Sequence, residues 1–295
     1  MSFNKQIISV EDLEYSYGNT KVLKGLNFTV EQGKIFGLFG KNGAGKTTTI
    51  NILMGFLTPE KGNCLIYGDK AAKLSDHNKR RIGLLHEGHI SYDFMTIDET
   101  EHFYKGFYPK WNSDIYKYFL EKLGLPRNRK INMSCGQRSQ GTLAVLMAQG
   151  AETLILDDFS MGLDAGYRRL FLDHLNQFVK ENNKTILITS HIVQDLEKFV
   201  DEAFIINKGQ VLVSAPLKNI KDGIYGYSLP LNSDISLFEK DSKILDISIT
   251  KENYNIISKI SPSEVGSFFE NINKEQIKEY DVTFEDAFIA LTGKY

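Results

Sequence analysis

Residues 40 to 48 read GKNGAGKTT, a glycine-rich run that ends in a lysine and two threonines. The run fits G-x-x-x-x-G-K-[ST], and it stands between an apolar stretch and the start of a helical pattern. Glycines let backbone N–H groups turn toward phosphate oxygens, and a helix N-terminus adds a partial positive charge. Lys46 would neutralise the outer phosphates, and the Thr47 hydroxyl could ligate Mg²⁺. The pattern therefore predicts a phosphate-binding loop. Its expected members are Gly40, Lys41, Asn42, Gly43, Ala44, Gly45, Lys46, Thr47 and Thr48.

Two adjacent acids, Asp157 and Asp158, directly follow the apolar residues of a TLIL run at 153–156. A carboxylate at the end of a buried strand is costly unless it is paired or binds a cation. A nucleotide on the phosphate loop needs an acid at the end of a neighbouring strand for its Mg²⁺. Asp157 occupies that place, so we expect it to hold the metal directly or through a water.

The elements that would position these groups can be read from hydrophobic periodicity. Residues 34–40, 152–157 and 184–190 have the composition of buried strands. A stripe of apolar residues at helical spacing separates the last two of these strands. The stripe consists of Leu170, Phe171, Leu175, Phe178 and Val179. Strand, helix and strand in this order predict parallel pairing through right-handed crossovers, and hence an α/β fold.

Composition changes along the chain predict its domains. Short β-type segments broken by Gly, Asn and Asp fill the first part, and helical spacing dominates from about residue 88 to 150. After residue 221 the chain becomes richer in Ser, Asn, Lys and Ile. We expect a domain over 1–221 that contains a helical subdomain at about 88–150, and a small accessory domain over 222–295. The TFED run from Thr283 to Asp286 predicts a capping box at the start of a C-terminal helix.

The overall composition excludes several classes of protein. The chain has 295 residues, with 35 Lys and Arg against 37 Asp and Glu. The resulting net charge of -2 gives no overall electrostatic attraction to nucleic acid. Two distant cysteines, Cys64 and Cys135, make no disulfide framework and fit a reducing compartment. We expect no signal peptide, and no run approaches the roughly 20 apolar residues that span a bilayer. A membrane span would have to come from another chain.

Further motifs complete a recognisable set. Residues 17–18 read YG, residues 133–137 read MSCGQ, residues 161–164 read MGLD, and residues 188–212 read ITSHIVQDLEKFVDEAFIINKGQVL. With the phosphate loop and the two acids, this set resembles the ATP-binding subunits of ATP-binding cassette (ABC) transporters over about residues 7–215. The closing VTFEDAFIALTG at 282–293 resembles the C-terminal signature of bacterial exporter-type members.

The resemblance implies a fold, partners and roles. The fold would be an α/β P-loop ABC ATPase core with an antiparallel β subdomain, an α-helical subdomain and a small C-terminal α+β domain. Two subunits, identical or paralogous, would dimerise head to tail around ATP and Mg²⁺, on the cytoplasmic face of the membrane. They would power a separately encoded permease, most simply an exporter, which contacts the region after Glu87, chiefly Ser91 to Thr96. No nucleic-acid partner is expected.

The resemblance also assigns individual residues. Tyr17 would stack on adenine, with Tyr15 as the fallback, and His191 would sense the γ-phosphate. Four residues would contact the nucleotide of the opposite subunit. These are Ser134, Cys135, Gly136 and Gln137. The expected catalytic residues are Asp158, His191, Glu87 and Lys46, and the expected metal ligands are Thr47, Asp157 and Glu87.

The sequence departs from the family pattern at informative places. Asp158 stands where the family has a Glu that acts as base or orients the attacking water, and Glu87 stands where it has Gln. Because a displacement of about 1 Å can cost roughly 100-fold in rate, Asp158 predicts slow hydrolysis, and Glu87 could partly compensate. Cys135, Phe159 and Met161 also depart from the pattern without removing a catalytic group.

Two other functions stay open on the sequence. One is a nucleotide-gated regulatory subunit with slow turnover, which Asp158 favours. The other is a soluble ABC ATPase of translation or DNA repair, although neither a second cassette nor a coiled-coil insertion is visible. The HEGH run at 86–89 does not have the H-E-x-x-H spacing of a zinc site, and the family motif around Glu87 accounts for it.

Overall fold

The computed structural model describes residues 5–87, 94–122, 124, 135–160, 163–190 and 193–293, without the side chains of residues 135, 136, 181 and 182. The chain divides into two compact units, Met1–Ser214 and Ala215–Tyr295. The sequence places this boundary after residue 221, where the composition changes. The division comes slightly earlier, within the strand β10 (Gln210–Pro216).

A six-stranded sheet forms the centre of the first unit, in the order β10-β9-β3-β8-β7-β6. β3 pairs in parallel with β8 and β9, and β7 pairs in parallel with β8 and β6. Every residue of β3, β7 and β8 is buried, which is the composition that parallel strands covered on both faces require. The predicted parallel pairing is therefore confirmed. The strands are β3 (Ile35–Phe39), β6 (Ile82–Leu85), β7 (Thr153–Leu156), β8 (Thr185–Ser190) and β9 (Glu202–Asn207).

An antiparallel sheet in the order β2-β1-β4-β5 packs beside it and forms the predicted β subdomain. Its apolar residues share one core with the helix α1 and the central sheet, through Leu13, Leu26, Ile50 and Phe204. Cys64 belongs to this core, and burial raises the pKa of its thiol to about 12. The elements are β1 (Gln6–Tyr17), β2 (Thr20–Glu31), α1 (Lys46–Leu53), β4 (Lys61–Ile66) and β5 (Asp69–Lys70).

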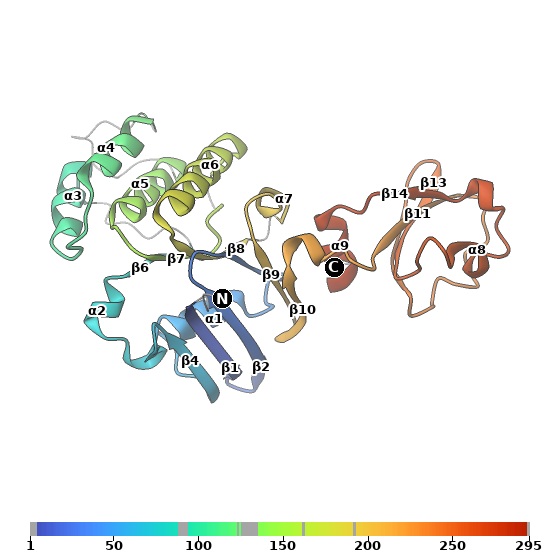
Figure 1. Ribbon diagram of the computed structural model, residues 1–295, viewed down its shortest axis with the longest axis horizontal. Helices are drawn as coiled ribbons and strands as arrows, with labels where there is room; N and C mark the ends of the chain where they lie inside the picture. The colour runs from blue at the N-terminus through green and yellow to red at the C-terminus, as the bar shows by residue number, and fades with distance from the viewer. Residues whose placement is uncertain are drawn as a thin grey trace. The chain divides into compact units, whose positions relative to one another are not determined.

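Helices cluster in the predicted helical region, where α3, α4 and α5 lie together (Figure 1). α3 starts with a capping box in which the Thr96 hydroxyl and the Glu99 carboxylate each accept a backbone N–H. The aromatic residues that follow pack on one another: the Trp111 ring stacks on Tyr104 and meets Tyr116 at 5.3 Å. Besides α1, the described helices of this unit are η1 (Ala71–Lys73), α2 (Asp76–Lys79), α3 (Ile97–Lys105), α4 (Ser113–Lys122), α5 (Cys135–Ala148), α6 (Ala165–Asn182) and α7 (Val193–Leu196).

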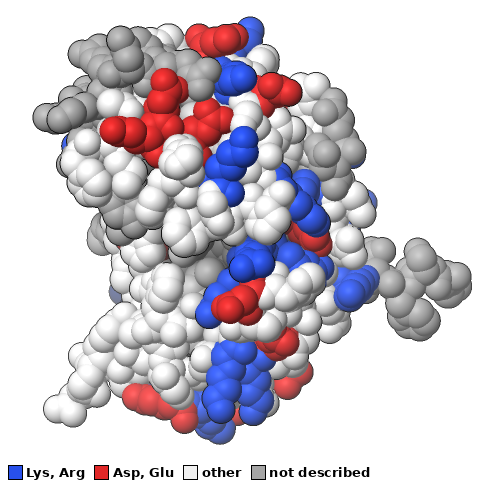
Figure 2. Space-filling view, turned by 90° about the vertical axis from the view of Figure 1, so that its left-hand side faces the viewer, with Lys and Arg blue, Asp and Glu red and all other residues white. Residues whose placement is uncertain are grey.

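Figure 2 views the molecule from the left-hand side of Figure 1, and basic and acidic side chains are interspersed on the face it shows. Among the described residues, Arg81 and Lys110 both pair with Glu152, at 2.8 and 2.9 Å. Burial opposes ionisation of Glu152, but the hydrogen bonds from Lys110 and Arg81 outweigh it and lower its pKa to about 2. The Glu152 carboxylate therefore stays ionised between two cations, which leaves this cluster with one net positive charge.

The second unit is a four-stranded antiparallel sheet, in the order β12-β13-β11-β14, with short helices. Its own core is built around Tyr227, Phe238 and Phe269, and the last two rings meet edge to face at 4.7 Å. The helix α9 begins at the predicted capping box, which Thr283 and Asp286 both complete. The elements are η2 (Leu217–Asn219), β11 (Tyr225–Pro230), β12 (Ile244–Ile249), β13 (Asn253–Ser258), α8 (Val265–Phe268), η3 (Lys274–Gln276), β14 (Lys278–Tyr280) and α9 (Phe284–Thr292).

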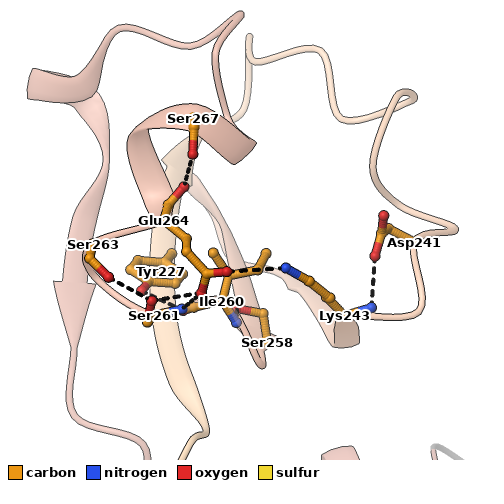
Figure 3. A network of polar contacts seen from close by, with 9 residues as sticks. All are labelled: Tyr227, Asp241, Lys243, Ser258, Ile260, Ser261, Ser263, Glu264 and Ser267. Carbon is orange, nitrogen blue, oxygen red and sulfur yellow. Dashed lines mark hydrogen bonds and ion pairs between the residues drawn. The ribbon is translucent and has the colours of Figure 1, made fainter.

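A polar network closes one end of this small sheet (Figure 3). The Glu264 carboxylate accepts the Ser261 hydroxyl at 2.7 Å and the Ser261 backbone N–H at 3.1 Å, and Lys243 donates to it at 3.3 Å. These bonds, led by the one from the Ser261 hydroxyl, lower the pKa of Glu264 to about 2. The network ties the turn after β13 to the loop before β12.

Candidate functional site

The predicted phosphate loop connects β3 to α1, and its glycines are required by its shape. Gly43 and Gly45 have φ of 77° and 109°, in the left-handed region that glycine adopts without strain. A Cβ on Gly45 would come within 2.5 Å of a Leu23 methyl, and one on Gly40 within 2.6 Å of the Ile206 carbonyl oxygen. A side chain at Gly40 would therefore push against backbone, whereas at Gly43 and Gly45 the left-handed conformation itself favours glycine.

Lys46 is the first residue of α1, and its side chain lies back along the loop. Its Nζ donates to the carbonyl oxygens of Gly40 at 2.7 Å and of Lys41 at 3.1 Å. Burial lowers the pKa of Lys46, while the carboxylates that line the same cavity act in the opposite direction. The ammonium therefore lies at the helix N-terminus beside the acids, where an anionic ligand would meet two sources of positive charge.

Asp157 follows the last residue of β7 and is only 1% exposed. The Thr189 hydroxyl donates to its Oδ1 at 2.8 Å, whereas its Oδ2 is buried with no hydrogen-bond partner among the described residues. Burial is the main reason that its pKa is raised, and the hydrogen bond from the Thr189 hydroxyl partly offsets the shift. A buried carboxylate oxygen without a partner is costly, and a bound cation would remove that cost.

The residues around Asp157 fit Mg²⁺ bound together with a nucleotide. Thr47 lies close enough for its Oγ1 to donate to Glu87 Oε2 at 3.4 Å, so hydroxyl and carboxylate oxygens share this end of the cavity. Among the described residues, no three His, Cys, Asp or Glu side chains gather into a metal cage. Mg²⁺ is commonly held by one or two carboxylates and the phosphates of a substrate, which is the donor set this site offers.

Asp158 adopts an unusual backbone conformation, with φ of 47°. Its N–H donates to the Thr189 hydroxyl at 2.9 Å, and its Oδ1 accepts the Ser160 hydroxyl at 3.1 Å. Aspartate tolerates the left-handed region better than most residues. The next residue, Phe159, is fully buried and packs on the Phe171 ring at 5.8 Å, so its side chain has a role in the core.

A cavity of about 310 Å³ joins these groups within the first unit. Tyr17 stands at its edge, half exposed, and Tyr15 supports it edge to face at 5.0 Å. The structure thus brings together groups from segments that are far apart in the sequence. The lining residues are Tyr17, Val22, Asn42, Gly43, Gly45, Lys46, Thr47, Thr48, Glu87, Asp157 and Asp158.

Other expected site residues lie elsewhere. Gly40, Lys41 and Ala44 shape the turn without lining the cavity, and Gln137 lies on α5 outside it. The structure describes the backbone of Cys135 and Gly136 but not their side chains, while Ser134 and His191 lie outside the described residues, as does the segment 88–93. Of the expected permease contacts, only 94–96 is described, where the Phe94 side chain is 68% exposed.

Three residues of the site were not anticipated from the sequence. Val22 lines the cavity, and the Thr189 and Ser160 hydroxyls hold the two acids. Only the position of Thr189 at the end of a buried strand could have suggested its role. Among the residues that the structure describes, no helix is long and apolar enough to cross a membrane.

The solved structures similar to this chain share its fold. One, an ATP-binding subunit of an ABC transporter, has a TM-score of 0.66 at 24% identity, and the match covers 73% of this chain and 92% of that one. Another, an ATP-binding cassette solved as a dimer in a post-hydrolysis state with ADP and Pi, has a TM-score of 0.63 at 20% identity. That match covers 72% of this chain and 99% of the cassette.

Sequence relatives identify the family. A family model described as ABC transporter matches residues 23–160. The bacitracin transport ATP-binding protein BcrA of Bacillus licheniformis is 34% identical over 218 residues, which is 73% of this chain and 71% of that protein. The Nod factor export ATP-binding protein I of Burkholderia lata is 30% identical over 252 residues, 80% of this chain and 83% of that protein. The chain belongs to the ABC transporter family, as one of its ATP-binding subunits.

Proposed function

We propose that this chain binds and hydrolyses ATP in order to drive a separately encoded membrane permease, as part of an exporter. The observation that carries the proposal is the cavity in which the phosphate loop, Lys46 and Asp157 converge. Its polar groups match a magnesium nucleotide: a cation and a helix N-terminus for the phosphates, and, for the metal, a carboxylate oxygen that has no partner in the described part of the chain. Relatives named for bacitracin transport and Nod factor export support a role in transport, and the second supports export.

In this proposal each residue has a distinct task. The loop N–H groups and Lys46 bind the phosphates, and Tyr17 covers the adenine. Thr47 and Asp157 would hold Mg²⁺, with Glu87 beside them, and the ion would neutralise charge on the phosphate oxygens. Asp158 orients the attacking water and accepts its proton.

A second ABC subunit completes the site in this proposal. Its residues 134–137 would contact the γ-phosphate from the opposite side, and His191 would sense that phosphate from within the subunit. Head-to-tail closure on ATP would then drive the permease through the region after Glu87. This places the protein at the cytoplasmic face of a membrane, without a nucleic-acid partner, and with either an identical or a paralogous second subunit.

Two measurements test the proposal. Purified protein should hydrolyse ATP in a Mg²⁺-dependent reaction whose rate rises faster than linearly with protein concentration, because two subunits share each site. Affinity purification of the tagged chain from its native membranes should recover a membrane-spanning partner. Hydrolysis without any membrane-spanning partner would overturn the transport role and leave the ATPase activity standing.

A second candidate is a nucleotide-gated subunit that binds ATP and turns it over slowly. The observation that favours it is Asp158, whose side chain is one methylene shorter than Glu and is hydrogen-bonded to Ser160. We also propose that Glu87, which lies in the same cavity, helps to hold the water and partly compensates. Turnover of the assembled complex separates a switch from a motor. Non-additive rates in Glu87→Gln, Asp158→Glu and their combination would test the compensation.

A further inference from the structure

The pairing of β7 with β8 brings one hydroxyl group against both acids. Leu156 pairs with Ile188 in the parallel register, so the following residues, Asp157 and Thr189, lie side by side where the two strands end. Thr189 is fully buried. Its hydroxyl donates to Asp157 Oδ1 at 2.8 Å and accepts the N–H of Asp158 at 2.9 Å. A single side chain therefore contacts both residues of the pair.

The two bonds have different consequences for the two acids. A hydroxyl has one proton to donate, and here it engages only one of the two Asp157 oxygens. The carboxylate is thereby held with Oδ2 as the oxygen without a partner among the described residues. The accepted N–H holds Asp158 where its φ is 47°, a conformation that the surrounding structure must impose.

We infer that Thr189 is a positioning residue that orients both acids at once. It selects Asp157 Oδ2 as the oxygen offered to the magnesium nucleotide, and it fixes the backbone from which the Asp158 carboxylate reaches the attacking water. This role rests on the proposed ATPase function. It explains why a hydroxyl is buried here although valine has nearly the same shape: valine would leave Asp157 Oδ1 and the Asp158 N–H without this partner.

The variant Thr189→Val removes the hydroxyl and keeps the shape, whereas Thr189→Ser keeps the hydroxyl. Thr185→Val is the matched control, because Thr185 lies on the same strand, is 1% exposed, and uses its hydroxyl to accept the N–H of Gly33 at 3.1 Å, away from the acids. All three variants lose or alter a buried threonine on β8. Only Thr189→Val loses the contact with the acids.

The main measurement is binding rather than activity. The dissociation constant for ATP is determined by calorimetry with Mg²⁺ and with EDTA, and their ratio gives the gain in affinity due to the metal. We expect this ratio to be about tenfold smaller in Thr189→Val than in wild type, which corresponds to the loss of one charge-assisted hydrogen bond. The affinity for ATP in EDTA should not change. The kcat of this variant should fall about 100-fold, as for a carboxylate misplaced by about 1 Å, with a much smaller change in KM.

The outcomes are distinct. Normal behaviour of Thr189→Ser and Thr185→Val, with loss in Thr189→Val, supports the role. If wild type gains affinity for ATP from Mg²⁺ and Thr189→Val shows the same gain as Thr185→Val, the positioning role of Thr189 is wrong, while the proposed function stands. A wild-type protein without any metal gain would overturn the proposed function and this role together. If Thr189→Val does not fold, Thr189→Ala is expected to show the same loss, and its retention of the metal gain would equally refute the role.

Discussion

Replacing Asp158 with Glu should raise the rate of ATP hydrolysis while lowering the stability of the protein. The extra methylene moves the carboxylate outward by about one carbon–carbon bond, about 1.5 Å. Since misplacement by about 1 Å can cost roughly 100-fold, the gain in kcat should lie between about 10-fold and 100-fold. The backbone is fixed by the bond from the Asp158 N–H to Thr189, so the added length cannot be absorbed easily by the chain.

The same change should cost stability for two reasons. Glu is less tolerant than Asp of a φ of 47°, and its longer side chain cannot keep the 3.1 Å bond from Ser160 in the same geometry. Loss of that bond alone would lower the free energy of unfolding by about 1 kcal/mol. A faster and less stable variant is therefore the specific expectation, because a change that only disturbed folding would lower the stability without raising kcat.

The assay compares kcat at saturating magnesium ATP, alongside thermal unfolding, for wild type, Asp158→Glu and Asp158→Asn. The Asn variant keeps the size of the side chain and removes the charge, and it should lose at least about 100-fold in kcat if Asp158 is the base. A fully active Asn variant would show that Asp158 is not the base. A Glu variant as slow as wild type would show that carboxylate position does not limit the rate.

Three further perturbations test other parts of the structure. Lys46→Ala should raise the dissociation constant for ATP by about 10- to 100-fold, because it removes one cation from the phosphates; calorimetry checks this, and unchanged affinity would exclude the phosphate role. Tyr17→Ala should weaken ATP binding about fivefold, as expected for one lost ring contact, and Tyr17→Phe should not; equal losses would argue against stacking. The pKa of Glu264 is about 2 in the folded protein, against an ordinary value of 4.5. Its ionised carboxylate therefore stabilises the fold at pH values above 4.5, and this stabilisation is lost as the pH falls from 4.5 toward 2. The protection factors of amides in residues 215–293, which compare each exchange rate with the intrinsic rate at the same pH, should therefore fall on acidification in wild type and change less in Glu264→Gln; parallel behaviour of the two would refute the assignment.

The sequence was sufficient to predict those groups whose surroundings in space are formed by residues close to them along the chain. The phosphate loop and Asp157 could be predicted because a glycine pattern, a strand end and a helix start are local features. Thr189 could not, because its role depends on the register that pairs Leu156 with Ile188, and a shift of one residue would face the hydroxyl away from the acids. The conformation of Asp158 was hidden for the same reason, since a hydrogen bond from a distant strand holds it.

The unit boundary shows a different limit of sequence reasoning. Composition changes after residue 221, but the compact units divide at Ser214. The intervening residues include Leu217 and Ile220, which are both buried although their neighbours are polar. Composition averages over such short segments, whereas a structural boundary depends on which core each apolar side chain joins.

Because Cys64 is buried, the reactivity of its thiol can report how often the antiparallel sheet of the first unit opens. Alkylating reagents attack the thiolate, and a thiol with a pKa of about 12 supplies almost none of it near neutral pH. Once β4 separates from β1, the same thiol would return to the ordinary value of about 8.5 and react at the normal rate. In a Cys135→Ser variant, where Cys64 is the remaining cysteine, the rate of alkylation would therefore measure how often the antiparallel sheet opens. A nucleotide that stabilises this subdomain would lower the rate of alkylation.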